Sequence, residues 1–158
     1  MARALIAVLM FWVPNAAHAN EVVNCLIRPG ALCVEANLEA AQLSGADLSM
    51  ADFSRANLRR ANLRGADLRN ADMDFTRLAG ADLSGAVLIE ADLTGAELRG
   101  ADLQHAQLQN ANLSGADLRH AVLDGADLRG ADLTGAQLEG ASLRRADTGG
   151  CVGCPAGS

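Results

Sequence analysis

The feature that most constrains this chain is a five-residue unit that repeats without an insertion from Ala36 to Arg145. The unit occurs in 22 consecutive copies, beginning ANLEA, AQLSG, ADLSM and ending ASLRR. Its first residue is Ala in 21 copies, with Thr76 as the exception, and its third is Leu in 20, with Phe53 and Met73 as the exceptions. The second residue is Asp or Asn in 14 copies. A period held this strictly indicates a repeat architecture rather than an ordinary globular fold.

A period of five fits neither regular secondary structure. In an α-helix, five residues turn the chain so that each Leu is displaced by about 140° from the last, and no apolar stripe forms. In a flat strand, an odd period sends successive Leu side chains to opposite faces. The pattern becomes consistent if every pentapeptide bends the chain by the same angle about one axis. Each Leu then points inward, each first-position Ala lies beside it, and stacked coils satisfy one another's backbone groups, which predicts a β-solenoid.

These residues resemble the pentapeptide-repeat family, whose consensus is A(D/N)LXX, and the resemblance covers 110 of the 139 residues that follow position 19. It implies an all-β fold, a right-handed quadrilateral β-helix with four pentapeptides per coil and one on each face. The repeats then make about five and a half coils, and at a spacing of roughly 4.8 Å the rod is about 26 Å long.

The composition excludes one broad class of function. Half of the chain is hydrophobic but aromatic residues make up only 3%, which suits an axis filled by Ala and Leu rather than a core of large rings. The net charge of −6 comes from 13 Arg and 19 acids, with no Lys. A protein that grips nucleic acid by its phosphates needs a basic surface, so we expect no nucleic-acid partner.

Residues 1–19 are typical of a secretory signal peptide. Arg3 supplies the positive end, residues 4–13 (ALIAVLMFWV) form an apolar run, Pro14 ends it, and residues 17–19 (AHA) provide a small-x-small cleavage pattern. We expect cleavage after Ala19, a periplasmic or secreted mature chain, and no membrane attachment after cleavage. A retained anchor or an N-terminal core helix is the alternative, although the apolar run is short for a span.

The repeat divides the rest of the chain into three segments. Residues 20–35 are expected to form an N-terminal cap, residues 36–147 the solenoid, and residues 148–158 a flexible Gly/Cys tail. Pro29-Gly30 marks a turn in the cap, and Cys33 takes an inward position. The apolar residues expected to cover the first Leu layer are Val22, Val23, Leu26 and Ile27.

The four cysteines lie in two pairs at opposite ends of the repeat, Cys25 with Cys33 and Cys151 with Cys154. An even count in an exported protein favours disulfides. Bonded Cα atoms lie within about 7 Å, so a bridge or a four-cysteine metal site between the two ends is excluded. We expect Cys25–Cys33 to staple the cap. For Cys151–Cys154 (CVGC), a passive disulfide, a metal or redox site, and covalent modification or intermolecular pairing remain open.

Two charged columns follow from folding four units per coil. The second positions of one face carry an acidic column: Asp52, Asp72, Asp92, Asn112 and Asp132. It suits a cation or a basic partner, but the favoured interpretation is that Asp and Asn bond the turns of the coil. Another face carries a column of Arg59, Arg99 and Arg119, interpreted as solvated counter-charge. His105 and His120 lie on neighbouring faces and are interpreted as plain surface residues.

The pattern is least regular between residues 71 and 90. Phe75 takes an outward position, Thr76 replaces the usual Ala, and Val87 and Ile89 flank Leu88 on one face. Outward apolar residues on an otherwise polar protein are typical of a contact surface, so Phe75, Val87 and Ile89 form a candidate interaction patch. The alternatives are drift in a tolerant repeat or packing beneath a local bulge.

No Ser-His-Asp or Cys-His arrangement can be assembled, and no catalytic, cofactor or metal residue is predicted. The sequence therefore favours a non-catalytic exported scaffold that binds another protein through the faces of its solenoid. One alternative is a metal- or redox-handling protein acting through Cys151 and Cys154. Another, implied by the family resemblance, is a DNA-mimic inhibitor of a type II topoisomerase if the leader is not used. Against it, the tail GGCVGCPAGS lacks the bulky apolar side chains through which such relatives dimerise.

Overall fold

The computed structural model describes residues 25–155 of the 158-residue chain. The expected leader and the rest of the cap before Cys25 lie outside the described residues, so the leader stays a prediction. Residues 25–155 contain no helix and no extended strand. Each pentapeptide instead contributes one bridged residue, its second, followed by a turn at its fourth and fifth residues.

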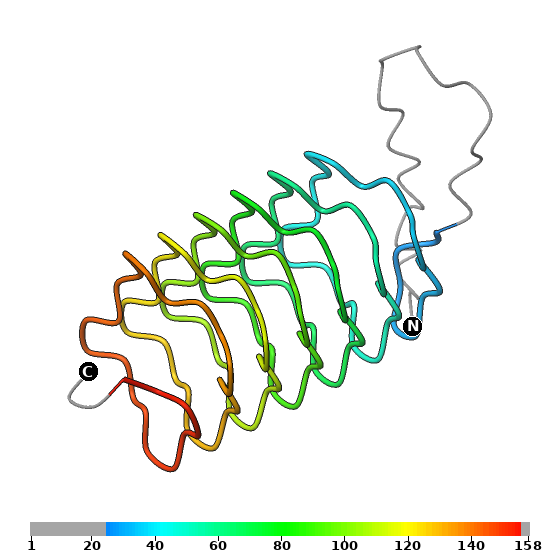
Figure 1. Ribbon diagram of the computed structural model, residues 1–158. Coiled ribbons are helices and arrows are strands. Elements are labelled where there is room, and N and C mark those ends of the chain that lie inside the picture. Colours follow the sequence, from blue (N-terminus) through cyan, green and yellow to red (C-terminus); the bar gives the residue numbers. More distant parts are fainter. Residues whose placement is uncertain (1–24, 156–158) are drawn as a thin grey trace, which may run out of the picture.

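Within residues 25–155, twenty-one parallel bridges set the register of the coil. Each joins a second-position residue to the residue twenty positions later, from Leu32 with Asp52 to Asp132 with Val152. Twenty residues per coil are four pentapeptides, which confirms the four-sided coil. Figure 1 shows these coils stacked into a rod with the described ends of the chain at opposite ends.

The four faces are named here by their pentapeptides. Face 1 contains residues 31–35 and every unit twenty residues further on, and face 2 contains residues 36–40 and their equivalents. Faces 3 and 4 begin with residues 41–45 and 46–50.

Backbone hydrogen bonds hold each coil to the next. The N–H of Leu93 donates to the carbonyl of Asn112 at 2.7 Å, and the N–H of Gly95 donates to the carbonyl of Ser114 at 2.9 Å. Within the turn, the N–H of Ala96 donates to the carbonyl of Leu93 at 3.0 Å. The same hydrogen bonds recur in successive coils, so the buried backbone N–H and carbonyl groups of one coil are satisfied by the next.

The first and third positions form the core, as the repeat predicts. Ala and Leu at these positions are buried along most of the rod, and so are the two third-position exceptions, Phe53 and Met73. Thr76, the first-position exception, is also fully buried. Its Oγ1 donates to the carbonyl of Phe53 at 2.9 Å, so the extra hydroxyl has a partner.

The fifth position adopts a left-handed backbone. Its φ is 66° at Gly45 and 63° at Gly95, and it is also positive at non-glycine residues, including 50° at Phe75. A side chain at such φ is strained, whereas Gly adopts it readily. This requirement explains why Gly is the commonest fifth residue of the repeat.

The regular coil extends beyond the boundaries that the repeat predicts. At its start, Leu32 is bridged to Asp52 and the side chain of Cys33 is only 2% exposed. At its end, the N–H of Val152 donates to the carbonyl of Ala131 at 2.9 Å. Residues 148–152, predicted as part of a flexible tail, therefore continue the solenoid. Backbone bonds between coils maintain the path here even where the A(D/N)LXX side chains are lost.

The predicted cover of the first Leu layer is corrected by the structure. Leu26 is 56% exposed and Ile27 is 39% exposed, so neither is packed into the end of the rod. Val22 and Val23 lie outside the described residues. Cys33 occupies the inward position at this end, as the repeat predicts.

Candidate interaction surfaces

The acidic column lies on face 1 as predicted, because parallel bridges join Asp52, Asp72, Asp92, Asn112 and Asp132 in order. Its side chains bond the turns that follow them. Asp92 Oδ1 accepts from the N–H of Thr94 at 2.9 Å, and Asp132 Oδ1 accepts from the N–H of Thr134 at 2.8 Å. This confirms the interpretation that second-position Asp and Asn stabilise turns.

The carboxylates that bond these turns keep their negative charge, so face 1 is strongly acidic. The hydroxyl and backbone N–H of Thr134 lower the pKa of Asp132 below its ordinary value, so it stays ionised at neutral pH. In residues 25–155, the acids of face 1 make no ion pair within 4.0 Å, and the only Arg of this face is Arg55. Those acids are Glu35, Asp52, Asp72, Asp74, Asp92 and Asp132.

Face 2 carries the Arg column, and two of its three Arg residues pair with acids of the same face. Arg59 Nη2 pairs with Glu97 Oε2 at 2.9 Å, and Arg119 Nη2 pairs with Asp117 Oδ2 at 2.6 Å. The bond from Arg119 lowers the pKa of Asp117. These Arg side chains therefore neutralise acids of their own face rather than those of face 1.

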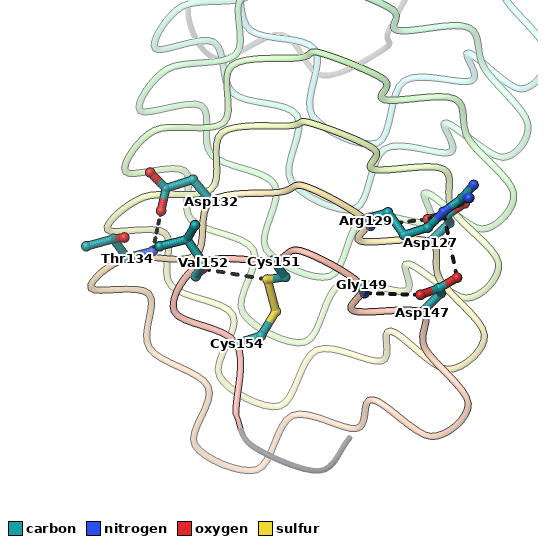
Figure 2. Close-up of a disulfide and its surroundings, with 9 residues drawn as sticks. All are labelled: Asp127, Arg129, Asp132, Thr134, Asp147, Gly149, Cys151, Val152 and Cys154. Carbon is teal, nitrogen blue, oxygen red and sulfur yellow. Dashed lines mark hydrogen bonds and ion pairs between the residues drawn. A yellow bond between two sulfur atoms is a disulfide. The ribbon is translucent and has the colours of Figure 1, made fainter.

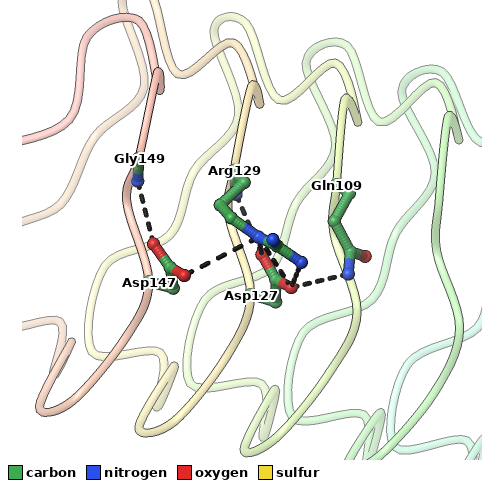
Figure 3. A network of polar contacts seen from close by, with 5 residues as sticks. All are labelled: Gln109, Asp127, Arg129, Asp147 and Gly149. Atoms are coloured by element: carbon green, nitrogen blue, oxygen red, sulfur yellow. Dashed lines mark hydrogen bonds and ion pairs between the residues drawn. The ribbon is translucent and has the colours of Figure 1, made fainter.

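Face 4 carries a chain of polar contacts that crosses three coils. Asp127 accepts hydrogen bonds from Arg129 through Nε at 2.9 Å, Nη2 at 2.6 Å and the backbone N–H at 3.2 Å, and another from Gln109 Nε2 at 2.6 Å. Arg129 Nε lies 3.6 Å from Asp147 Oδ2, and Asp147 Oδ1 accepts from the N–H of Gly149 at 3.1 Å. Figure 3 shows this network reaching the coil that contains Gly149, so surface charge ties the terminal coils together.

The candidate patch of Phe75, Val87 and Ile89 does not form one face. Phe75 is the last residue of a face 1 unit, whereas Val87 and Ile89 lie on face 4 and are half-buried. The Phe75 ring, 52% exposed, leans over the neighbouring corner, where a Cβ on Gly95 would lie 2.6 Å from its Cε1. The alternative of local packing fits Phe75, because the ring covers a glycine.

The two histidines follow the same corner arrangement. A Cβ on Gly125 would lie 2.6 Å from His105 Nδ1, and one on Gly140 would likewise meet His120 Nδ1. His105 belongs to face 3 and His120 to face 2, which places them on neighbouring faces as predicted. Across residues 25–155, no three His, Cys, Asp or Glu side chains come together to hold a metal ion.

The cysteines pair locally. Cys25 is bonded to Cys33 with a Cα–Cα distance of 4.8 Å, and Cys151 to Cys154 with one of 5.8 Å. Figure 2 places the second disulfide in the last coil, beside the bridge of Val152 with Asp132.

Gly153 makes the close approach of this last turn possible. Its φ is 75°, and a Cβ at this position would lie 2.7 Å from the carbonyl carbon of Leu133. The Gly between the two cysteines therefore lets the chain end lie directly against the previous coil.

Sequence reasoning missed one feature, a depression on face 2 at Ala79 and Gly80. It measures about 650 Å³ and lies among the Arg residues of the column. The signal was present in the sequence, because aligning fourth positions at intervals of twenty places Ala79 between Arg59 and Arg99. The gap in the Arg column is visible only when residues twenty positions apart are aligned.

A search for membrane spans found no helix long and apolar enough within residues 25–155. A comparison with curated proteins gives no significant match.

Comparison with solved structures gives several similar proteins. A pentapeptide-repeat protein (Rfr23) from the cyanobacterium Cyanothece 51142 is 31% identical, with a TM-score of 0.60, over 77% of this chain and 90% of that one. HetL of Nostoc sp. strain PCC 7120, a pentapeptide-repeat protein involved in heterocyst differentiation regulation, is 35% identical over 80% of this chain and 76% of that one, with a TM-score of 0.41. QnrB1, a plasmid-mediated fluoroquinolone resistance protein, is 22% identical over 75% of this chain and 77% of that one, with a TM-score of 0.38.

The family model for pentapeptide repeats matches residues 36–74, 76–115 and 111–147 in eight copies. These matches, the twenty-residue register and the likeness to Rfr23 agree with one another. The chain belongs to the pentapeptide-repeat family and has its β-helical fold.

Proposed function

We propose that this protein is an exported, non-catalytic scaffold that binds a basic protein partner through face 1. The observation that carries the proposal is the acidic column of face 1, whose side chains are partly exposed along the rod, most so at Asp72, and have no ion pair among residues 25–155. Turn bonds fix the orientation of its carboxylates, so a partner meets a preorganised row of negative charge.

Export is part of the proposal and is supported by residues 1–19. Their charged end, apolar run and cleavage pattern match a signal peptide. The paired cysteines of the described chain agree with an oxidising compartment.

Site-specific cross-linking in cells tests the partner. A photo-reactive residue at Asp72 samples face 1, and one at Arg64, an exposed residue of face 3, is the matched control. We expect a protein adduct at Asp72 and none at Arg64, and loss of the adduct when Asp92→Lys is added. Equal adducts at both sites, or none at either, would contradict binding through face 1.

Export and the alternatives are tested on protein recovered from fractionated cells. We expect an N-terminus at Asn20, no free thiol and no bound metal. A cytosolic chain beginning at Met1 would overturn export and favour the topoisomerase alternative, which inhibition of DNA supercoiling then tests. Free or metal-bound thiols at Cys151 and Cys154 would favour the metal or redox alternative.

A further inference from the structure

A notch interrupts the Arg column of face 2. Fourth positions 59, 99 and 119 carry Arg, but the residue between the first two is Ala79, followed by Gly80 at the corner. Ala79 and Gly80 have minimal side chains, and they line a depression of about 650 Å³ that runs along this face. Charged residues line it: Glu39, Arg59, Arg60, Glu97, Arg99, Asp117 and Arg119.

Of these four Arg side chains, two form ion pairs with acids of the same face and two do not. Arg59 and Arg119 are half-buried and paired with Glu97 and Asp117. Arg60 and Arg99 are exposed and make no ion pair within 4.0 Å to any residue in 25–155. The notch therefore contains two guanidinium groups whose donors are available.

The backbone places these two residues on opposite sides of the notch. The N–H of Arg60 donates to the carbonyl of Ala79 at 3.1 Å, and the N–H of Gly80 donates to the carbonyl of Arg99 at 3.0 Å. Arg60 and Arg99 thus lie in the two coils that flank Ala79–Gly80, roughly 10 Å apart at two strand spacings. The side chain of Arg60 lies against the neighbouring corner at Gly80, where a Cβ would be 3.8 Å from Arg60 Cγ.

We propose that this notch binds one compact oxyanion group, a phosphate or a carboxylate, held by Arg60 and Arg99 across Ala79–Gly80. Guanidinium groups bond both kinds of anion through paired N–H donors. Face 2 is also the only face with more Arg than acids, five against four, within a chain of net charge −6. Glu39, the acid of this lining that makes no ion pair among residues 25–155, repels a long polyanion and favours a single anionic group.

This site is independent of the scaffold proposal, because it uses the opposite charge on a different face. A failure of cross-linking at Asp72 has no bearing on the notch, and a failure of anion binding has none on face 1.

NMR titration of the intact chain with inorganic phosphate, and separately with acetate, tests the site at low salt. We expect saturable shifts of the Arg60 and Arg99 Nε–H signals with at least one of the two anions. Tighter binding of phosphate identifies a phosphoryl group as the ligand chemistry, and tighter binding of acetate identifies a carboxylate. Linear, non-saturating shifts with both anions would overturn the proposal.

Matched variants separate the notch from general charge. Arg99→Gln and Arg60→Gln should each weaken the anion that binds by about tenfold, as expected for the loss of one charge-assisted hydrogen-bonding partner. Arg55→Gln removes the same charge from the same kind of corner position as Arg60, but on face 1, and should leave affinity unchanged. Ala79→Leu places an apolar side chain between Arg60 and Arg99 without changing charge and should weaken the saturable binding. Equal affinity in Arg99→Gln and Arg55→Gln, with unchanged circular dichroism, would sink the assignment.

Discussion

At the residue scale, the cost of adding a side chain at a corner glycine depends on which residue of the neighbouring coil covers that glycine. Gly95 and Gly115 have almost the same backbone, with φ of 63° and 67°, and differ in that Phe75 covers only Gly95. Gly95→Ala must displace the ring as well as strain the backbone. We therefore expect it to lower the free energy of unfolding by about 1 kcal/mol more than Gly115→Ala does.

Urea denaturation of the two variants measures this difference. In a Phe75→Ala background the ring is gone, and the two glycine substitutions should then cost the same. A difference that persists without the ring would show that Phe75 is not its cause.

Thr76 provides a second prediction at this scale. Its hydroxyl bonds the carbonyl of Phe53, but the N–H of Ala56 donates to the same oxygen at 2.8 Å. Thr76→Ala restores the usual first residue and leaves that carbonyl satisfied. The free energy of unfolding of Thr76→Ala, measured by urea denaturation, should fall by less than about 1 kcal/mol. A larger decrease would contradict the assignment of Thr76 as a tolerated exception.

At the scale of the coil, burial of a third-position Leu depends on whether another coil lies on each side of it. Leu98 is fully buried in the middle of face 2, whereas Leu138, in the last coil of the same column, is only partly buried. An Asp at position 98 is surrounded by apolar side chains and has no partner. Leu98→Asp should cost about 4 kcal/mol or more and unfold the rod, whereas Leu138→Asp should fray its end.

Thermal melting followed by circular dichroism distinguishes these outcomes. We expect no cooperative transition for Leu98→Asp and a modestly lowered Tm for Leu138→Asp. Equal melting temperatures for the two variants would mean that third-position side chains do not point to the axis.

The sequence predicts the interior of each coil better than its exterior. Ala and Leu positions specify the core because a five-residue unit has one inward register, and the structure buries Phe53 and Met73 where the repeat places them. The apolar patch and the notch depend instead on which units share a face. Phe75 and Val87 are close in sequence yet lie on different faces, while Ala79 and Arg59 are twenty residues apart and adjacent.

The ends of the coil were less predictable for a related reason. Residues 148–152 lack the Leu and Asp signature, so the sequence indicates a tail. Their position is fixed by backbone bonds such as that from Val152 to Ala131, which any residue except Pro can make. Side-chain patterns therefore underestimate how far a solenoid continues.

At the scale of the whole molecule, acid should destabilise the rod. Hydrogen bonds from Arg69, Ser84 and Thr134 lower the pKa values of Asp67, Asp82 and Asp132 below the ordinary 3.8. A carboxyl whose pKa is lower when folded stabilises the fold above its unfolded pKa. That stabilisation is lost as the pH falls from about 3.8 through the lower folded values.

Urea midpoints measured from neutral pH to below pH 3.8 test the sign. We expect the midpoint to fall across this window. Asp82→Asn keeps an acceptor for the N–H of Ser84, which Asp82 accepts at 2.9 Å, but has no proton to gain. That variant should show a smaller acid-induced decrease, and an unchanged pH profile would contradict the role of Asp82.

Because the bridges join residues twenty positions apart, a deletion of five residues and a deletion of twenty residues have different effects on the molecule. Deleting five residues keeps an Ala and a Leu in every later unit, so the interior survives, but every later side chain moves to the neighbouring face. Arg99 would leave the notch, and part of the acidic column would turn a corner. Deleting twenty residues leaves every face aligned. The rod can therefore lengthen or shorten by quarter-turns without losing its fold, whereas a lineage that must keep a binding face is restricted to whole turns.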